Sequence, residues 1–258
     1  MPAGFVYLVG AGPGPLDLLT LKAASLLKNA DVIVYDRLIQ PTVLDLAKPT
    51  AERIFMGKLL GGPVSQQDDI HALLLQKARE GKTVVRLKGG DPFMFGRGGE
   101  EAEFLAAHDV PFEVVPGVSS ALAAPLRAGI AVTHRGVSSS VVFVTGHEAH
   151  DDASGLDWEA LARIQTLVFM MAVDNVRRIA TRLIANGRSP STPVAIIQKA
   201  FWEDERVVTS TLEAMADDVE RCGVQAPATL VVGDVVRLRD KLVGMMGHPS
   251  GDRPANEP

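Results

Sequence analysis

The feature that most constrains the fold is a glycine-rich run that ends a buried strand. Residues 84–87 (VVRL) are typical of a short buried strand, and residues 89–101 (GGDPFMFGRGGEE) follow it after one lysine. Glycine packs no side chain and proline donates no ladder hydrogen bond, so the strand cannot continue through this run. Backbone without side chains can closely approach a ligand. The run therefore predicts a turn at a sheet edge that is also a binding site, rather than an ordinary connection.

Short apolar runs alternate with amphipathic segments along most of the chain. The runs rich in strand formers are residues 5–9, 32–35, 83–87, 113–115, 141–144, 166–170, 194–197 and 229–232. Between them, apolar side chains recur at the spacing of one helical face in residues 19–30, 70–78, 176–184 and 212–219. This alternation predicts an α/β fold with two α/β domains, residues 1–117 and 118–240. Residues 247–258, with three prolines and no apolar period, predict a disordered tail.

Charge and hydropathy exclude several classes of function. The net charge is −5 and Lys and Arg form no block, so we expect no nucleic-acid partner. No apolar run reaches the roughly 20 residues that cross a bilayer. Residues 1–4 (MPAG) do not resemble the start of a signal peptide, so we expect a cytoplasmic protein without membrane contact. The negative net charge does not exclude an anionic small substrate, because a local group of arginines can make the electrostatic potential positive inside one cleft.

The sequence offers little for thiol or metal chemistry. The single cysteine, Cys222, excludes an internal disulfide and a Cys-rich metal site. His147 and His150 are three residues apart, but they lack a supporting third ligand and lie in a predicted loop. We therefore expect no metal.

A second glycine-rich turn, residues 10–14 (GAGPG), follows the first predicted strand. Asp36, at the end of the second strand, lies where the ribose-binding acid of a dinucleotide site is expected. Two prolines argue against that interpretation: Pro15 replaces the third glycine, and Pro13 has no N–H to hold a pyrophosphate. A ligand-facing turn that does not grip phosphate fits better, and a nicotinamide-dependent oxidoreductase stays as an alternative.

Seven motifs, in order along the chain, carry a resemblance to a known family. They are residues 9–14 (VGAGPG), 34–38 (VYDRL), 85–101 (VRLKGGDPFMFGRGGEE), 115–121 (VPGVSSA), 133–136 (THRG), 144–147 (VTGH) and 227–233 (PATLVVG). Through them the chain resembles the tetrapyrrole methylase family, over residues 5 to about 238. The resemblance implies two α/β domains with S-adenosylmethionine (SAM) in the cleft between them, usually in a homodimer.

The resemblance also implies which residues contact SAM and its product, S-adenosylhomocysteine. These are Pro13, Gly89, Gly90, Asp91, Met94, Ser119, Ser120, Met171, Ala200, Ala228 and Thr229. Bare backbone suits the sulfonium and amino acid parts of the cofactor, while Met94, Met171 and Ala200 offer an apolar wall for adenine. For Met171, a plain core residue is an equally good interpretation. Residues 201–202 (FW) depart from the family, which commonly has a threonine after the alanine and a glutamine further on.

The substrate that the resemblance implies is uroporphyrinogen III, a macrocycle ringed by carboxylates. Two successive methyl transfers would give precorrin-2, for sirohaem- or cobalamin-type biosynthesis. Because arginine binds carboxylates bidentately, Arg97 and Arg135 are the first choices for substrate binding, with Arg37 and Lys58 as weaker candidates. The alternatives are a sister methylase that acts on a later precorrin intermediate and a non-catalytic tetrapyrrole carrier.

The implied reaction needs positioning and a base. An electron-rich pyrrole carbon attacks the sulfonium methyl group in line, so holding the two in place supplies most of the rate gain. A proton later leaves the methylated macrocycle, and a base assists. The candidate catalytic residues are Arg97, Glu100, one helical turn further on, and Asp36. An Arg97–Glu100 pair is equally compatible with a structural ion pair.

Overall fold

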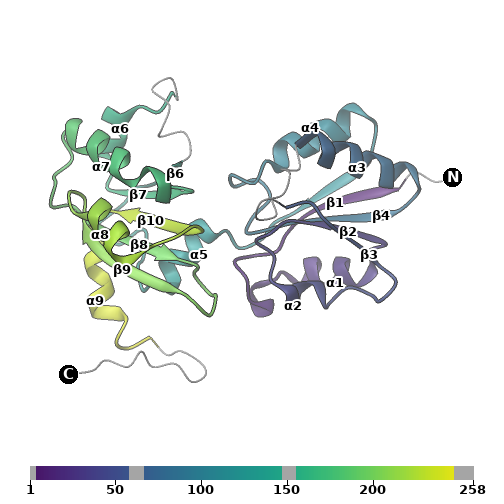
Figure 1. The fold of residues 1–258 in the computed structure, drawn as a ribbon, viewed down its shortest axis with the longest axis horizontal. Helices are drawn as coiled ribbons and strands as arrows, with labels where there is room; N and C mark the ends of the chain where they lie inside the picture. Colours follow the sequence, from purple (N-terminus) through teal and green to yellow (C-terminus); the bar gives the residue numbers. More distant parts are fainter. Residues whose placement is uncertain (1–3, 58–66, 147–154, 247–258) are drawn as a thin grey trace. The chain divides into compact units, whose positions relative to one another are not determined.

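The computed structural model describes residues 4–57, 67–146 and 155–246. The chain divides into two compact units, Met1–Ala123 and Ala124–Pro258. Each unit is built on its own five-stranded sheet (Figure 1), so the predicted α/β class is confirmed. The tail predicted at 247–258, Lys58 and the two histidines His147 and His150 lie outside the described residues.

The first unit has a parallel sheet in the order β3-β2-β4-β1-β5, covered by helices on both faces. Its strands are β1 (Phe5–Gly10), β2 (Val32–Tyr35), β3 (Glu52–Phe55), β4 (Thr83–Lys88) and β5 (Phe112–Val115). Its helices are the 3₁₀ turn η1 (Leu16–Leu18), α1 (Leu21–Asn29), α2 (Pro41–Leu44), α3 (Gln67–Arg79) and α4 (Gly98–Ala107). In Figure 1, α1 and α2 lie on one face of the sheet and α3 and α4 on the other.

The apolar runs of this sheet are continuous because both faces are covered. Successive side chains of a strand point to opposite faces. In β1, Val9 packs into the cluster that contains Leu27 of α1, and Leu8 packs into the cluster that contains Leu74 of α3. The central strands are therefore apolar at nearly every position, which makes the charged Arg86 within β4 an exception.

The second unit has a mixed sheet in the order β6-β7-β10-β8-β9. Strand β6 (Val141–Thr145) runs parallel to β7 (Thr166–Met170), whereas β10 (Ala228–Val232) is antiparallel to both of its neighbours, β7 and β8 (Pro193–Gln198). Strand β9 (Arg206–Thr211) pairs antiparallel with β8 at the edge. The α-helices are α5 (Ser120–Arg127), which contains the division between the units, α6 (Trp158–Arg163), α7 (Val176–Ala185), α8 (Met215–Cys222) and α9 (Arg239–Leu242). The 3₁₀ turns are η3 (Val173–Asn175) and η4 (Asp234–Leu238).

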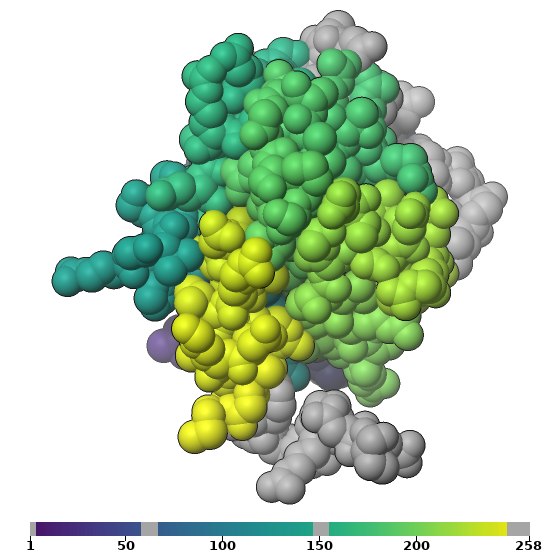
Figure 2. Space-filling model, turned by 90° about the vertical axis from the view of Figure 1, so that its left-hand side faces the viewer, coloured from purple at the N-terminus to yellow at the C-terminus, as the bar shows by residue number. Residues whose placement is uncertain are grey.

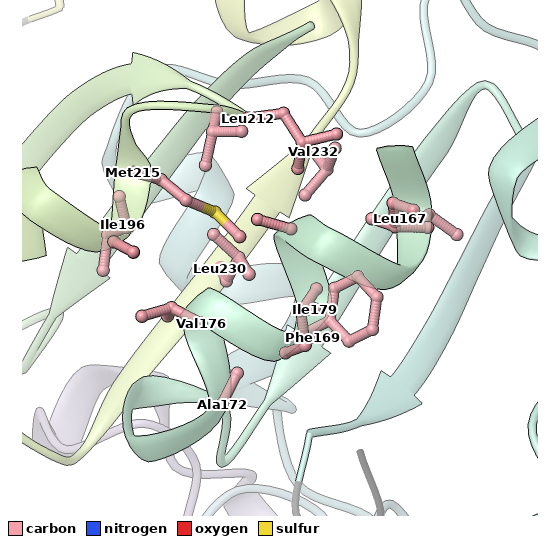
Figure 3. Close-up of a cluster of buried hydrophobic side chains, with 14 of the residues drawn as sticks. Leu167, Phe169, Ala172, Val176, Ile179, Ile196, Leu212, Met215, Leu230 and Val232 are labelled. Atoms are coloured by element: carbon pink, nitrogen blue, oxygen red, sulfur yellow. The ribbon is translucent and has the colours of Figure 1, made fainter. Parts of the chain in front are cut away.

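A hydrophobic core of the second unit lies between one face of its sheet and the helices α6, α7 and α8. Figure 3 shows Phe169 of β7 and Leu230 of β10 meeting Ile179 of α7 and Met215 of α8. These four side chains are almost completely buried. No helix in the described ranges is long and apolar enough to cross a membrane.

Replacing Phe169 by alanine is expected to destabilise the second unit by about 3–5 kcal/mol, because it removes a fully buried ring and leaves a cavity. The two tryptophans of the chain, Trp158 and Trp202, both lie in this unit, so their fluorescence in urea reports its unfolding. The control is Met245→Ala, at a side chain that is 89% exposed, with an expected change below about 0.5 kcal/mol. Equal midpoints for the two variants would contradict this account of the core.

Candidate functional site

The predicted site residues of the first unit gather at one edge of its sheet. Because its strands are parallel, their carboxyl ends lie at the same edge. Pro13 follows β1, Asp36 follows β2, residues 89–94 follow β4, and Ser119 and Ser120 follow β5. Helices α1 and α4, which follow β1 and β4, lie on opposite faces of the sheet (Figure 1). Ligands of open α/β sheets bind at such a point.

Backbone atoms fill the space between these turns. Gly12 N–H donates to Gly90 O at 3.1 Å, and Gly90 N–H donates to Gly12 O at 2.8 Å. A Cβ on Gly117 would lie only 2.2 Å from Gly90 O, and one on Gly10 would lie 2.5 Å from Gly117 N. Only glycine permits this approach, so peptide groups rather than side chains lie between the turns.

The carboxylate of Asp91 ties two of these turns together. Its Oδ1 accepts from Phe93 N–H at 2.9 Å and its Oδ2 accepts from Gly117 N–H at 3.2 Å. The neighbouring Met94 is half-buried, and Ser119 Oγ accepts from Ala121 N–H at 3.2 Å. Asp91 therefore shapes the turn in addition to any contact that it makes with a cofactor.

Arg97 and Glu100 form the expected ion pair at the start of α4. Arg97 Nε donates to Glu100 Oε1 at 2.9 Å and Nη2 donates to Oε2 at 2.7 Å. Their side chains are 56% and 50% exposed, and pairs this exposed add little stability. The hydrogen bond from Arg97 holds the pKa of Glu100 below its usual range. The pair thus presents a cation and an ionised carboxylate side by side to solvent.

Asp36 is held by a buried arginine. Arg86 Nη2 of β4 donates to Asp36 Oδ2 at 2.9 Å, and only 3% of the Arg86 side chain is exposed. Arg37, the next residue, is exposed. Sequence reasoning did not find Arg86, Lys88 or Glu101, three charged residues that are buried at this edge. Arg86 and Lys88, two cations in the otherwise mostly apolar strand β4, were the sequence signal that could have indicated this buried group.

The predicted residues of the second unit also share one sheet edge. Met171 follows β7, Ala200 lies just after β8, and Ala228 and Thr229 begin β10. Because β10 runs antiparallel to both neighbours, its first residues lie beside their last ones: Thr229 pairs with Met170, next to Met171. The side chain of Met171 is 52% exposed, so its interpretation as a core residue is wrong.

Strained backbone is concentrated in the turns at these two edges. Non-glycine residues with positive φ in them are Phe95 (54°), Arg97 (59°), Met171 (54°), Lys199 (47°) and Phe201 (70°). One other described non-glycine residue, Asp109 after α4, has a positive φ of 54°. Such conformations cost about 1–3 kcal/mol each and gather at functional sites. The strained residues lie in the long glycine-rich motif (Phe95 and Arg97) and beside the predicted contacts Met171 and Ala200.

Phe201 and Trp202, which depart from the family's sequence after Ala200, have defined contacts in the structure. The Phe201 ring lies beneath the Arg127 guanidinium, 5.5 Å from its centre, and Phe201 N–H donates to Glu205 Oε2 at 2.6 Å. Arg127 Nε in turn donates to Glu205 Oε2 at 3.0 Å. Trp202 N–H donates to Lys199 O at 2.9 Å, which closes the turn. These contacts fix the strained turn that contains Ala200.

Arg135 lies at the tip of a tight hairpin in the second unit. His134 and Ser138 exchange two backbone hydrogen bonds of 2.9 Å, and the buried Ser138 Oγ lies 2.7 Å from Thr166 Oγ1. Arg135 itself is exposed. Figure 2 looks onto this unit, where the teal stretch around α5 and the turn after it projects at one side. Within the described residues, His, Cys, Asp and Glu form no group of three or more that would hold a metal.

These features define an α/β protein with glycine-rich and strained turns at the edges of its two sheets, and comparison with known proteins identifies its family. The sequence model of the Tetrapyrrole (Corrin/Porphyrin) Methylases matches residues 6–216. The S-adenosyl-L-methionine-dependent uroporphyrinogen III methyltransferase of Methanosarcina barkeri is 52% identical over 241 residues, 93% of this chain and 94% of that protein. The chain belongs to the tetrapyrrole methylase family.

Two further relatives extend this comparison. The siroheme synthase of Azotobacter vinelandii is 50% identical over 96% of this chain, which spans only 54% of that protein. Among solved structures, uroporphyrin-III C-methyl transferase from Thermus thermophilus, complexed with S-adenyl homocysteine, has a TM-score of 0.78 and 45% identity. That match covers 91% of this chain and 100% of the Thermus chain.

Removing the Glu205 carboxylate is expected to loosen the turn at Ala200. In Glu205→Ala, the Phe201 amide loses its charged acceptor, and its hydrogen exchange should accelerate by about tenfold, as expected for the loss of about 1.5 kcal/mol. Exchange followed by mass spectrometry of peptides across residues 199–206 measures this change. Glu203→Ala, an exposed carboxylate in the same turn, should leave exchange unchanged. Equal exchange in both variants would refute the role given to Glu205.

Proposed function

We propose that this protein is a SAM-dependent C-methyltransferase that adds two methyl groups to uroporphyrinogen III and forms precorrin-2. The observation that carries the proposal is the 52% identity with a methyltransferase of that substrate over nearly the whole of both chains. The full activity of the siroheme synthases is not part of the proposal, because the chain spans about half of their length.

The residues at both sheet edges fit SAM. In the first unit we assign its contacts to the bare backbone of Gly89 and Gly90 and to five further residues: Pro13, Asp91, Met94, Ser119 and Ser120. In the second unit we assign them to Met171, Ala200, Ala228 and Thr229. The exposed Met171 supplies an apolar surface beside the start of β10, where Thr229 pairs with Met170. When bound, SAM supplies an electrophilic methyl group on a sulfonium.

In the mechanism that we propose, the chain's own residues orient the macrocycle and receive a proton. Arg97 offers a planar fork that matches a carboxylate, and Arg135 offers a second cation. Glu100 and Asp36 are the candidate bases, each bound to an arginine. The pKa of Glu100 is lowered by Arg97, so Glu100 is ionised at neutral pH and accepts a proton only weakly while that hydrogen bond lasts.

We further propose that the protein acts in the cytoplasm as a homodimer, with no nucleic-acid or membrane partner. Leu122 and Leu126 of α5 are four residues apart on one helical face, and their side chains are 50% and 64% exposed. A second copy of the chain would cover this apolar surface. The net charge of −5 does not favour a nucleic acid.

The activity is tested by anaerobic incubation with SAM and freshly generated uroporphyrinogen III, followed by mass spectrometry of the tetrapyrrole. We expect a gain of two methyl groups, with S-adenosylhomocysteine formed in step. SAM binding without methylation would instead favour a sister methylase of a later precorrin intermediate, and macrocycle binding without turnover would favour a carrier. A higher melting midpoint with NAD, but not with SAM, would favour the oxidoreductase.

Truncating Arg97 is expected to abolish most activity while sparing cofactor binding. In Arg97→Ala, losing a bidentate contact to a substrate carboxylate should lower kcat/KM by about 100-fold, whereas the dissociation constant of SAM should stay nearly constant. The control is Arg221→Ala, because Arg221 is also exposed and paired with a carboxylate three residues away. Weakened SAM binding with intact turnover would overturn the role assigned to Arg97.

A further inference from the structure

Four charged side chains meet at the carboxyl edge of the first sheet, and three of them are buried. Arg86, Lys88 and Glu101 are 2%, 3% and 0% exposed, and Asp36 completes the group from the end of β2. Burial is the largest cause that lowers the pKa of the Lys88 ammonium, followed by the charge of Arg86, while Glu101 opposes both. Burying charges is costly even when they are paired, so a group like this calls for an explanation.

Glu101 is the centre of the group. Its Oε1 accepts from Arg86 Nε at 3.1 Å, from Lys88 Nζ at 2.9 Å and from Gln67 Nε2 at 3.3 Å. Arg86 and Lys88 are two residues apart in β4 and therefore point to the same face of the sheet, the face that α4 covers. One carboxylate thus binds two neighbouring cations of the strand and joins α4 to it.

Each of these contacts leads to a residue that the proposed reaction uses. Glu101 directly follows Glu100 in the first turn of α4, and its N–H donates to Arg97 O at 3.2 Å. The stem of Lys88 lies beneath the turn before Arg97: a Cβ built on Gly96 would lie 3.4 Å from Lys88 Cε. The other end of the Arg86 guanidinium holds Asp36 at 2.9 Å. Glu101 is therefore in direct contact with Arg97 and adjacent to Glu100, and it is connected to Asp36 through Arg86.

The group is not arranged for greatest stability. Glu101 Oε2, Arg86 Nη1 and Asp36 Oδ1 are buried and have no hydrogen-bond partner among the described residues. Unpaired buried polar atoms destabilise a fold, and apolar replacements of buried ion pairs often stabilise it. The arrangement instead fixes the orientation of the side chains, because Glu101 binds both cations and Arg86 is held between Glu101 and Asp36.

We propose that Glu101 is the positioning residue of the substrate site, which fixes Arg97 and Glu100 through the first turn of α4 and Asp36 through Arg86. Glu101 does not itself touch the substrate in this proposal. The inference rests on the proposed function, because it concerns how the residues of that reaction are held.

The test separates positioning from stability by restoring the charge balance. Glu101→Gln leaves two buried cations with one carboxylate, so its melting midpoint should fall. Adding Lys88→Met keeps the stem beneath Gly96 and removes the surplus cation, so the midpoint of the double variant should recover. Glu103→Gln, an exposed glutamate of the same helix, is the matched control.

For both Glu101→Gln and the double variant, we expect kcat/KM for uroporphyrinogen III to fall by about tenfold or more, because the reacting groups lose their orientation. The dissociation constant of S-adenosylhomocysteine should stay within about threefold of wild type. If Glu101→Gln does not fold, the double variant alone decides. Wild-type kcat/KM in the folded double variant, or unchanged kcat/KM in a folded Glu101→Gln, overturns the inference. An inactive wild-type protein overturns the proposed function itself.

Discussion

The structure of the first unit depends on the close approach of three backbone turns at the carboxyl edge of its sheet. A Cβ added to Gly117 would lie only 2.2 Å from Gly90 O, and Gly12 and Gly90 are hydrogen-bonded to each other. No side chain therefore fits between these turns. These turns lie at the carboxyl edge of the sheet, which is where parallel sheets bind ligands. The glycines that let the turns pack together are thus the same ones whose bare backbone we propose to contact the cofactor.

The central strands of both sheets were predictable from the sequence, and two edge strands were not. Residues 5–9 and 83–87 are covered on both faces, so almost every position is apolar. Such a continuous apolar run predicts a strand without knowledge of its distant contacts. In contrast, β3 (ERIF) and β9 (RVVTST) lie at sheet edges and are partly exposed along their length. An edge strand buries little apolar surface, so its sequence resembles a loop.

At the candidate site, contacts between residues close in sequence could be predicted. Contacts between residues that only the sheet brings together could not. The Arg97–Glu100 pair follows from a spacing of three residues in a helix. The contact between Asp36 and Arg86 joins residues 50 apart, and it exists because β2 and β4 are neighbours. Glu101 has no local signal at all, since a glutamate in the first turn of a helix normally faces solvent. Burial overrides that expectation here.

In the mechanism that we propose, the ion pair between Arg97 and Glu100 at the start of α4 links substrate binding to the basicity of Glu100. The hydrogen bond from Arg97 is the largest cause of the lowered pKa of Glu100, and the whole Nε–Nη2 edge of the guanidinium is engaged in it. A substrate carboxylate that takes this edge removes the hydrogen bond from Glu100, whose pKa then rises toward its ordinary value. In the proposed mechanism, occupation of Arg97 by a substrate carboxylate would therefore make Glu100 a better proton acceptor. The buried Glu101 ties the main chain of this turn to β4 through its ion pair with Lys88 and its N–H to Arg97 O, so we assign the exchange of partners to the Arg97 and Glu100 side chains.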